Sequence, residues 1–311
     1  MSTLQIKHLF GLRGVSQSDI RTILDTAMDF RQVLERPVKK VPSLRGVTVV
    51  NLFFENSTRT RTSFELAEKR LSADTINFTT SNSSVKKGET LLDTLRNIEA
   101  MKIDLVVVRH KGTGVPKFLA DHSKAIIVNA GDGAHEHPTQ ALLDMLTIEQ
   151  HLGSLKNKRI AIIGDIRHSR VARSNLWGLT TMGAHVTLCA PSTLAPRNRE
   201  FFNSVHFEQD VRKAVHEADA VIALRLQKER TDDSLLPSMR EYRNFFGITR
   251  DVLEQASPSA LIMHPGPINR GVELDSEMAD SDQSVILEQV TNGVAVRMAV
   301  LFLLSGGRAS E

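Results

Sequence analysis

Cysteine is almost absent from this sequence, and its scarcity excludes two kinds of stabilising site. Cys189 is the single cysteine among 311 residues, so the chain can form neither an internal disulfide nor a zinc site built from several cysteines. Small secreted domains commonly depend on such cross-links. The composition therefore favours a reducing compartment, and we expect a cytoplasmic protein.

Long apolar runs are also lacking. The opening residues, MSTLQIKHLFGLRG, contain no apolar stretch as long as that of a signal peptide. No window approaches the roughly 20 apolar residues that a membrane-spanning helix needs. We therefore expect neither secretion nor insertion into a membrane.

The charge balance has little bias toward either sign. The 39 lysines and arginines stand against 36 acidic residues, and basic residues neither form a long run nor alternate with aromatic ones. General binding to nucleic acid is therefore not indicated. The calculated isoelectric point of about 9.0 is compatible with small anionic substrates.

What the sequence does contain is a pattern for binding an anion at the start of a helix. Residues 47–54 are almost continuously apolar and rich in valine, which is typical of a buried strand in a parallel sheet. Ser57 then suits a helix N-cap, and apolar residues recur behind it at helical spacing. Hydroxyl and guanidinium groups share the expected first turn: Ser57, Thr58, Arg59, Thr60 and Arg61. Together with unpaired backbone N–H groups they favour a phosphate or carboxylate ligand, although a capped helix with solvated arginines is the plain alternative.

Strand and helix patterns alternate along the chain and predict an α/β protein with two lobes, each a parallel sheet flanked by helices. Strands are expected at 47–54, 76–79, 105–108 and 125–129 in the first lobe, and at 159–164, 185–190, 220–224 and 261–263 in the second. An amphipathic segment, 138–152, connects the lobes, and the apolar segment 292–304 is expected to return to the first. The turn at 164–170 lacks G-x-G-x-x-G, so dinucleotide binding has little support.

Several motifs in order resemble those of the aspartate and ornithine carbamoyltransferases. Residues 57–61, Ser-Thr-Arg-Thr-Arg, resemble the family's carbamoyl phosphate motif, and residues 137–140, His-Pro-Thr-Gln, resemble its His-Pro-x-Gln. Residues 224–230 resemble the loop that selects aspartate, and residues 264–267, His-Pro-Gly-Pro, follow. The resemblance runs from Glu55 to beyond Asn292. It implies a carbamoyl phosphate-binding domain, 1–138 plus 292–311, and an aspartate-binding domain, 139–291.

The resemblance also implies a role for individual residues. Catalytic residues would be Arg59, Thr60, Arg109 and His137. Carbamoyl phosphate would be bound by Ser57, Thr58, Arg59, Thr60, Ser83, Lys87, Arg109, His137, Gln140, Gly266 and Pro267. Aspartate would be bound by Lys87, Arg170, Arg225 and Gln227. No metal or cofactor is implied.

Some of these residues also have ordinary explanations. A histidine before a proline is more often a turn or capping residue, and a serine-rich loop with two lysines is commonly a solvated loop. Ser84 is a rival to Ser83 as the matching serine. Gly266 stands where aspartate-specific members often carry leucine, but only the backbone carbonyl is expected to act there.

The activity implied is transfer of the carbamoyl group of carbamoyl phosphate to the α-amino group of L-aspartate, in de novo pyrimidine biosynthesis. In this family a serine and a lysine at the positions of Ser83 and Lys87 are donated by a neighbouring subunit, which implies a homotrimer with shared active sites. A regulatory chain or a dihydroorotase partner remains open. The alternatives are a carbamoyltransferase for another amine such as ornithine, disfavoured by Arg225 and Gln227, and a non-catalytic phosphate-binding subunit.

Overall fold

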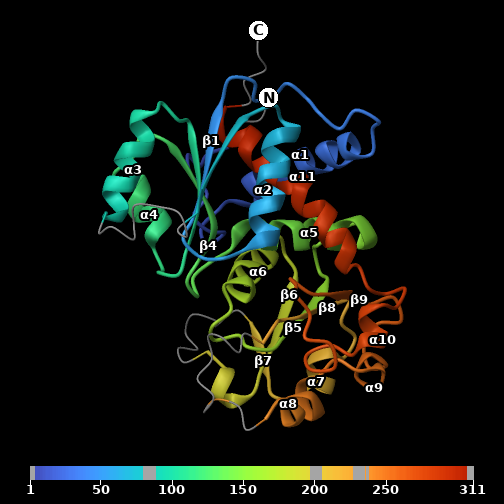
Figure 1. Ribbon diagram of the computed structural model, residues 1–311. Coiled ribbons are helices and arrows are strands. Elements are labelled where there is room, and N and C mark those ends of the chain that lie inside the picture. Colours follow the sequence, from blue (N-terminus) through green and yellow to red (C-terminus); the bar gives the residue numbers. More distant parts are fainter. Residues whose placement is uncertain (1–3, 80–88, 197–204, 227–234, 236–237, 307–311) are drawn as a thin grey trace. The chain divides into compact units, whose positions relative to one another are not determined.

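The computed structural model describes residues 4–79, 89–196, 205–226, 235 and 238–306. The chain forms two compact units, which we call unit 1 (1–146 and 291–311) and unit 2 (147–290). The division falls inside helix α5, Pro138–Leu152, and inside helix α11, Ile286–Leu304 (Figure 1). The functional domain boundaries at 138 and 292 stay predictions.

Unit 1 contains a sheet of four parallel strands in the order β2-β1-β3-β4. The strands are β1 (Thr48–Phe53), β2 (Asp74–Thr79), β3 (Leu105–His110) and β4 (Ile126–Asp132). Five of the six residues of β1 are buried, as its run of apolar residues predicts. Phe53 pairs with Arg109, so β1 and β3 end at the same edge of the sheet.

Helices cover both faces of this sheet, and Figure 1 shows α3 and α4 on the face opposite to α1, α2 and α11. Four of them are α1 (Gln17–Leu34), α2 (Thr58–Arg70), α3 (Leu91–Ala100) and α4 (Val115–Ala120). Leu95 of α3 and Leu119 of α4 pack in one cluster with Val106 of the central strand β3. On the other face, the Phe302 ring of α11 meets the Phe30 ring of α1 edge-on at 5.6 Å.

Helix α11 is apolar around most of its circumference. By length and composition alone it could cross a membrane, a possibility that the sequence analysis did not foresee. Within the structure 61% of that window is buried, and the core helices of folded proteins pass the same test.

Unit 2 contains five parallel strands in the order β7-β6-β5-β8-β9. The strands are β5 (Arg159–Ile163), β6 (His185–Cys189), β7 (His206–Glu208), β8 (Ala220–Ala223) and β9 (Leu261–Met263). With two parallel sheets and flanking helices, the predicted fold class is confirmed. The sequence analysis missed β7, which has only three residues and no run of apolar ones.

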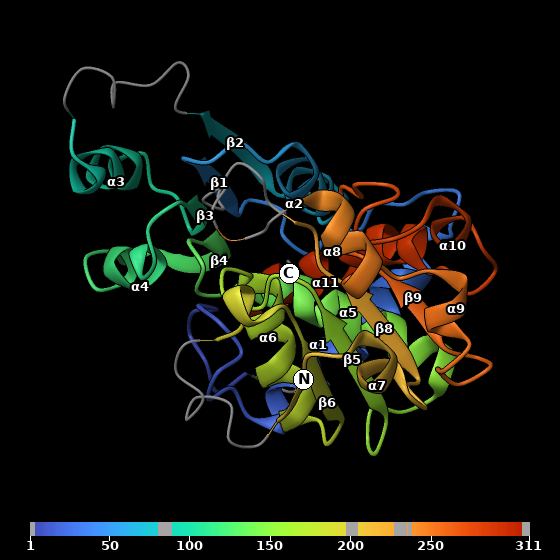
Figure 2. The same ribbon diagram turned by 90° about the horizontal axis from the view of Figure 1, so that it is seen from below.

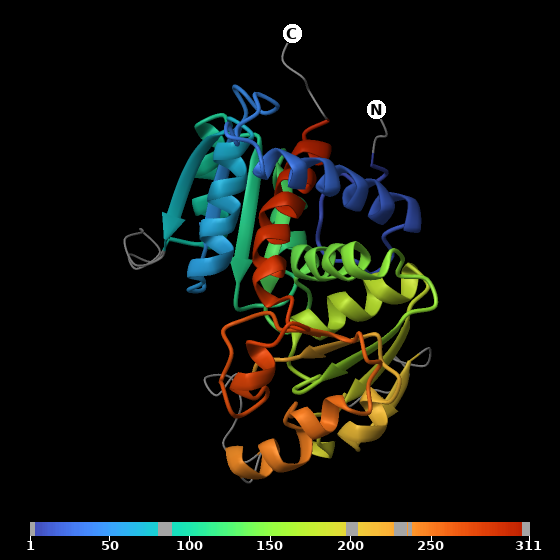
Figure 3. The same cartoon turned by 90° about the vertical axis from the view of Figure 1, so that its right-hand side faces the viewer.

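Helix α6 lies on one face of this sheet and α7 with α9 on the other, as Figures 2 and 3 show. The helices are α6 (Arg170–Thr181), α7 (Val211–Val215), α8 (Met239–Phe246), α9 (Arg250–Leu253) and α10 (Ser276–Ala279), with a 3₁₀ turn at Ser192–Leu194. Val215 of α7, Val252 of α9 and Met278 of α10 share one apolar cluster with β5 and β8. Most of these helices are too short for a clear apolar period.

Candidate active site

Helix α2 begins directly after β1 and leaves its N-terminal groups exposed. Ser57 occupies the N-cap position, as predicted, but within the described residues its hydroxyl accepts no capping hydrogen bond. Thr58 and Arg59 are exposed, Thr60 is half-buried, and none of the first-turn residues is acidic. The positive end of the helix dipole therefore lies beside hydroxyl and guanidinium groups, without a carboxylate of its own first turn to neutralise it.

The buried side of α2 contains a carboxyl group. Glu68 is fully buried, and its Oε2 accepts a hydrogen bond of 2.9 Å from Nδ2 of Asn51 on β1. Burial raises the pKa of Glu68 from its usual value to about 7, while hydrogen bonds from Thr75 and Asn51 partly oppose the shift. The carboxyl group of Glu68 therefore changes its protonation state near neutral pH.

Arg109 joins the ends of three neighbouring strands. It lies on β3, one residue before the strand ends, and its side chain is 11% exposed. Its Nε lies 3.3 Å from Oε2 of Glu55, between β1 and α2, and its Nη1 donates a hydrogen bond of 3.1 Å to the Ala130 carbonyl on β4. Sequence reasoning missed Glu55, although it lies only two residues before Ser57. The pair places the guanidinium group of Arg109 beside the start of α2.

His137 and Gln140 lie at the start of α5 and are both buried. The His137 carbonyl accepts the N–H of Gln140 at 3.0 Å. Nε2 of Gln140 donates a hydrogen bond of 3.0 Å to Oδ1 of Asp144, one turn further along α5. With its amide nitrogen used in this way, Gln140 keeps Oε1 as the end that can accept a hydrogen bond from a ligand.

Helix α11 contributes a buried arginine, Arg297, which contacts α2. Nη1 of Arg297 donates to Oγ of Ser63 at 3.1 Å, and the guanidinium group lies 5.1 Å from the centre of the Phe64 ring on α2. Burial lowers the pKa of Arg297 to about 10, and the charge of Asp144 opposes that shift. The arginine thus supports α2 and, through Asp144, the amide of Gln140. A lone arginine in an apolar helix was its sequence signal.

In unit 2 the predicted aspartate ligands follow two strands. Arg170 is the first residue of α6 and is only 4% exposed. Ser169 caps this helix by accepting the N–H of Ala172 at 3.1 Å. Arg225 lies two residues after the end of β8, at the start of the segment that follows the strand.

The turn at residues 264–267 contains a cis peptide bond, between Gly266 and Pro267. Nδ1 of His264 accepts the N–H of Gly266 at 2.8 Å, which closes the turn. Four residues named for the site, Ser83, Ser84, Lys87 and Gln227, lie outside the described residues. The roles of all the site residues stay predictions.

Family models match both halves of the chain. Residues 7–150 match the aspartate/ornithine carbamoyltransferase carbamoyl-P binding domain, and residues 156–304 match the Asp/Orn binding domain. The aspartate carbamoyltransferase catalytic subunit of Gemmatimonas aurantiaca is 58% identical over 302 residues, covering 97% of this chain and 94% of the relative. The chain belongs to the aspartate carbamoyltransferase family. The catalytic subunit of Cytophaga hutchinsonii is 57% identical and covers 99% of this chain and 100% of its own.

Solved structures of carbamoyltransferases share the fold of this family member. Aspartate transcarbamoylase of Trypanosoma cruzi, in complex with carbamoyl aspartate and phosphate, has a TM-score of 0.86 at 30% identity, with 95% of each chain covered. Ornithine carbamoyltransferase of Pyrococcus furiosus has a TM-score of 0.88 at 28% identity and covers 99% of this chain and 100% of its own. The fold is therefore common to enzymes for either amine.

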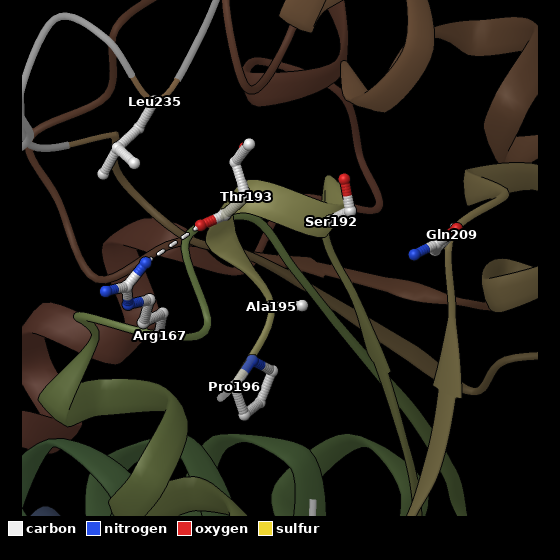
Figure 4. Close-up of a pocket in the computed structure, with 7 residues that line it drawn as sticks. All are labelled: Arg167, Ser192, Thr193, Ala195, Pro196, Gln209 and Leu235. Atoms are coloured by element: carbon white, nitrogen blue, oxygen red, sulfur yellow. Dashed lines mark hydrogen bonds between the residues drawn. The ribbon is translucent and has the colours of Figure 1, made fainter. Parts of the chain in front are cut away.

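Unit 2 of this carbamoyltransferase chain also contains a hollow of about 400 Å³, whose lining residues are drawn in Figure 4. Arg167, Thr193, Gln209 and Leu235 are among its lining residues, and the predicted site residues that the structure describes are not. Nη1 of Arg167 points to the Thr193 carbonyl at 3.4 Å. No group of three or more potential metal-binding side chains gathers within the described ranges.

Proposed function

We propose that this chain transfers the carbamoyl group of carbamoyl phosphate to the α-amino group of L-aspartate, giving N-carbamoyl-L-aspartate and phosphate. The amine nitrogen forms a bond to the carbamoyl carbon, and the bond from that carbon to the phosphate oxygen breaks. The leaving phosphate takes the proton that the amine gives up. This assignment combines the family membership of the chain with the chemistry of its anion-binding helix.

The observation that carries the proposal is the start of α2 beside Arg109. Ser57, Thr58 and Thr60 offer hydroxyls next to the first-turn N–H groups, and Glu55 holds Arg109 beside them. A phosphate dianion would be bound there by charge-assisted hydrogen bonds. Glu55 already occupies one side of Arg109, so a bound phosphate competes with that carboxylate.

The carbamoyl oxygen gains negative charge as the amine attacks. We assign its stabilisation to hydrogen-bond donors of Arg59, Thr60, Arg109 and His137, which would face the oxygen on which the charge develops. Oε1 of Gln140 accepts from the carbamoyl NH₂ group, because its amide nitrogen is held by Asp144. The carbonyls of Gly266 and Pro267 are further acceptors for the same NH₂ group.

Aspartate presents two carboxylates, which require cationic or amide partners. Arg170 and Arg225 in unit 2, with Gln227 and Lys87, are the groups that we assign to them. Ornithine carries a second ammonium group in place of the second carboxylate, so two arginines would repel it. The names of the relatives at 54–58% identity also favour aspartate.

We further propose a cytoplasmic homotrimer in which Ser83 and Lys87 of one subunit complete the site of its neighbour. The pathway is de novo pyrimidine biosynthesis, to which the enzyme activity belongs. A regulatory chain or a dihydroorotase partner would be an addition to this catalytic unit.

The deciding experiment is an assay of purified full-length protein with carbamoyl phosphate and either L-aspartate or L-ornithine, with its mass measured by light scattering. Carbamoyl aspartate formed by a trimer or larger assembly, with no product from ornithine, is the expected result. Product from ornithine alone would overturn the choice of amine. Phosphate binding without turnover of either amine would instead support a non-catalytic binding subunit.

A further inference from the structure

Glu273 is a buried carboxylate in unit 2 with three hydrogen-bond donors around it. It is 1% exposed, and its Oε1 accepts from Nε2 of His264 at 3.1 Å and from the backbone N–H of Asn269 at 2.6 Å. Its Oε2 accepts from Nδ2 of Asn269 at 3.1 Å. Such a group is costly to bury unless its partners are fixed, so the carboxylate orders the residues around it.

His264 connects Glu273 to the turn at residues 264–267. Its Nδ1 accepts the N–H of Gly266 at 2.8 Å, and therefore the proton of a neutral ring lies on Nε2, facing Glu273. The backbone N–H of His264 donates to Oε1 of Gln289 at 3.0 Å. The imidazole is thus fixed in one tautomer and one orientation, with the carboxylate on one side and the Gly266 amide on the other.

Asn269 connects Glu273 to a second segment, residues 224–226. The two hydrogens of its Nδ2 serve different acceptors, Oε2 of Glu273 at 3.1 Å and the Leu226 carbonyl at 3.2 Å. Leu226 is buried and directly follows Arg225. One carboxylate is therefore connected both to the turn that contains Gly266 and Pro267 and to the segment that contains Arg225.

We infer that Glu273 is a positioning residue that holds the carbamoyl-contacting turn and the aspartate-contacting segment in one arrangement. The inference rests on the proposed function for the roles of those two segments, but the connection itself is geometric. Glutamine at this position would keep the shape and replace one acceptor oxygen by an NH₂ donor. A donor facing a donor breaks at least one of the three bonds, and the turn or the segment must then shift.

The test compares Glu273→Gln and Asn269→Ala with the wild type as full-length proteins. Glu273→Gln should lower kcat/KM for aspartate by roughly ten- to hundredfold, as expected when a buried charged group loses a hydrogen bond. Asn269→Ala keeps the contact from His264 to Glu273 and should mainly raise KM for aspartate. Inorganic phosphate, measured by calorimetry, should bind both variants as it binds the wild type, because its proposed ligands among the described residues lie in unit 1.

Glu277→Gln is the matched control, since Glu277 is an exposed carboxylate of the same unit that pairs with Arg250 on the surface. It should leave kcat and KM unchanged. If Glu273→Gln does not fold, Asn269→Ala provides the test by itself. Its KM for aspartate should rise while its affinity for inorganic phosphate stays at the wild-type value. Wild-type kinetics for aspartate in both variants would overturn the inference.

Crystal structures of the two variants separate this inference from the proposed function. Displacement of residues 264–267 or 224–226 in Glu273→Gln, and of residues 224–226 in Asn269→Ala, is expected whether or not the protein turns over aspartate. Unchanged positions of both segments would overturn the inference even in an active enzyme. A wild-type protein without carbamoyl transfer would overturn the proposed function alone.

Discussion

Two helices of this protein start in the same way and use their first serine differently. In unit 1, β1 leads into α2 with Ser57 at the N-cap, and in unit 2, β5 leads into α6 with Ser169 there. The hydroxyl of Ser169 accepts a hydrogen bond from the N–H of Ala172, whereas within the described residues the hydroxyl of Ser57 accepts no such bond. A helix start that caps itself has less to offer an anion. The comparison therefore marks α2 as the helix start suited to binding phosphate.

The two helices also differ in how they are anchored. Three residues of α2 are buried, and one of them is Glu68, while α6 buries seven. Polar and charged contacts also hold α2, such as those of Asn51 with Glu68 and of Ser63 with Arg297. Because the pKa of Glu68 is raised to about 7, the anchoring of α2 should depend on pH.

The largest effect should come from removing the exposed cation at the start of α2. Arg59→Ala should lower kcat by about 10²–10³, because the loss of one fixed donor to a developing oxyanion typically costs ~3–4 kcal/mol. Steady-state kinetics with both substrates saturating measures this. Lys69→Ala, at the far end of the same helix, is the control and should be neutral. An Arg59→Ala enzyme with nearly normal kcat would remove the catalytic distinction between α2 and α6.

The next effect concerns the anchoring of α2. The pKa of Glu68 in the folded state, about 7, lies above its usual value of 4.5, so the folded protein binds the proton more tightly than the unfolded chain. Wild-type stability should therefore fall as pH rises from about 4.5 to about 7. Between pH 5 and pH 8, Glu68→Gln should gain roughly 2–3 kcal/mol relative to the wild type.

Urea unfolding of both proteins at the two pH values measures this difference. Glu65→Gln, at a half-buried carboxylate on the same helix paired with Lys69, is the control. A free-energy difference between Glu68→Gln and wild type that stays constant with pH would show that α2 is not anchored through a titrating carboxyl.

Ser57→Ala should weaken binding more than it weakens the fold. A hydroxyl that binds a charged phosphate contributes about 1.5 kcal/mol or more, so the Kd for inorganic phosphate should rise about tenfold. Its melting temperature should barely change, because the hydroxyl is not used in capping. Calorimetry and thermal unfolding of one preparation test both points. Normal phosphate binding with a lowered melting temperature would show that Ser57 stabilises its helix, as Ser169 does, and does not bind phosphate.

Ser169→Ala should show the opposite pattern and the smallest effect. Loss of its cap on α6 should cost about 1 kcal/mol of stability. The affinity for inorganic phosphate should stay at the wild-type value. Because each serine is replaced by alanine at a helix N-cap, the two variants are controls for each other. Equal behaviour of the two would mean that both helix starts serve the same purpose.

Much of the fold could be predicted where the local pattern is long. The apolar run at 47–54 became β1, and the strand expected at 105–108 became β3. Helix α8 was missed, because it has no apolar run and Tyr242 is its single buried residue. The strand expected at 220–224 became β8, which ends one residue earlier, at Ala223.

In the candidate site, too, local features could be predicted from the sequence and contacts between distant residues could not. By itself the sequence determined that a helix with hydroxyl and guanidinium groups in its first turn follows a buried strand, because those residues and the β-branched run are local and adjacent in the chain. Tertiary structure alone decided which partners fix those groups. Glu55 meets Arg109 across 54 positions, Arg297 reaches Ser63 across 234, and Asn269 reaches Leu226 across 43. Such contacts depend on how strands and helices pack, and nothing in the local pattern of charge and hydrophobicity encodes a partner so far along the chain.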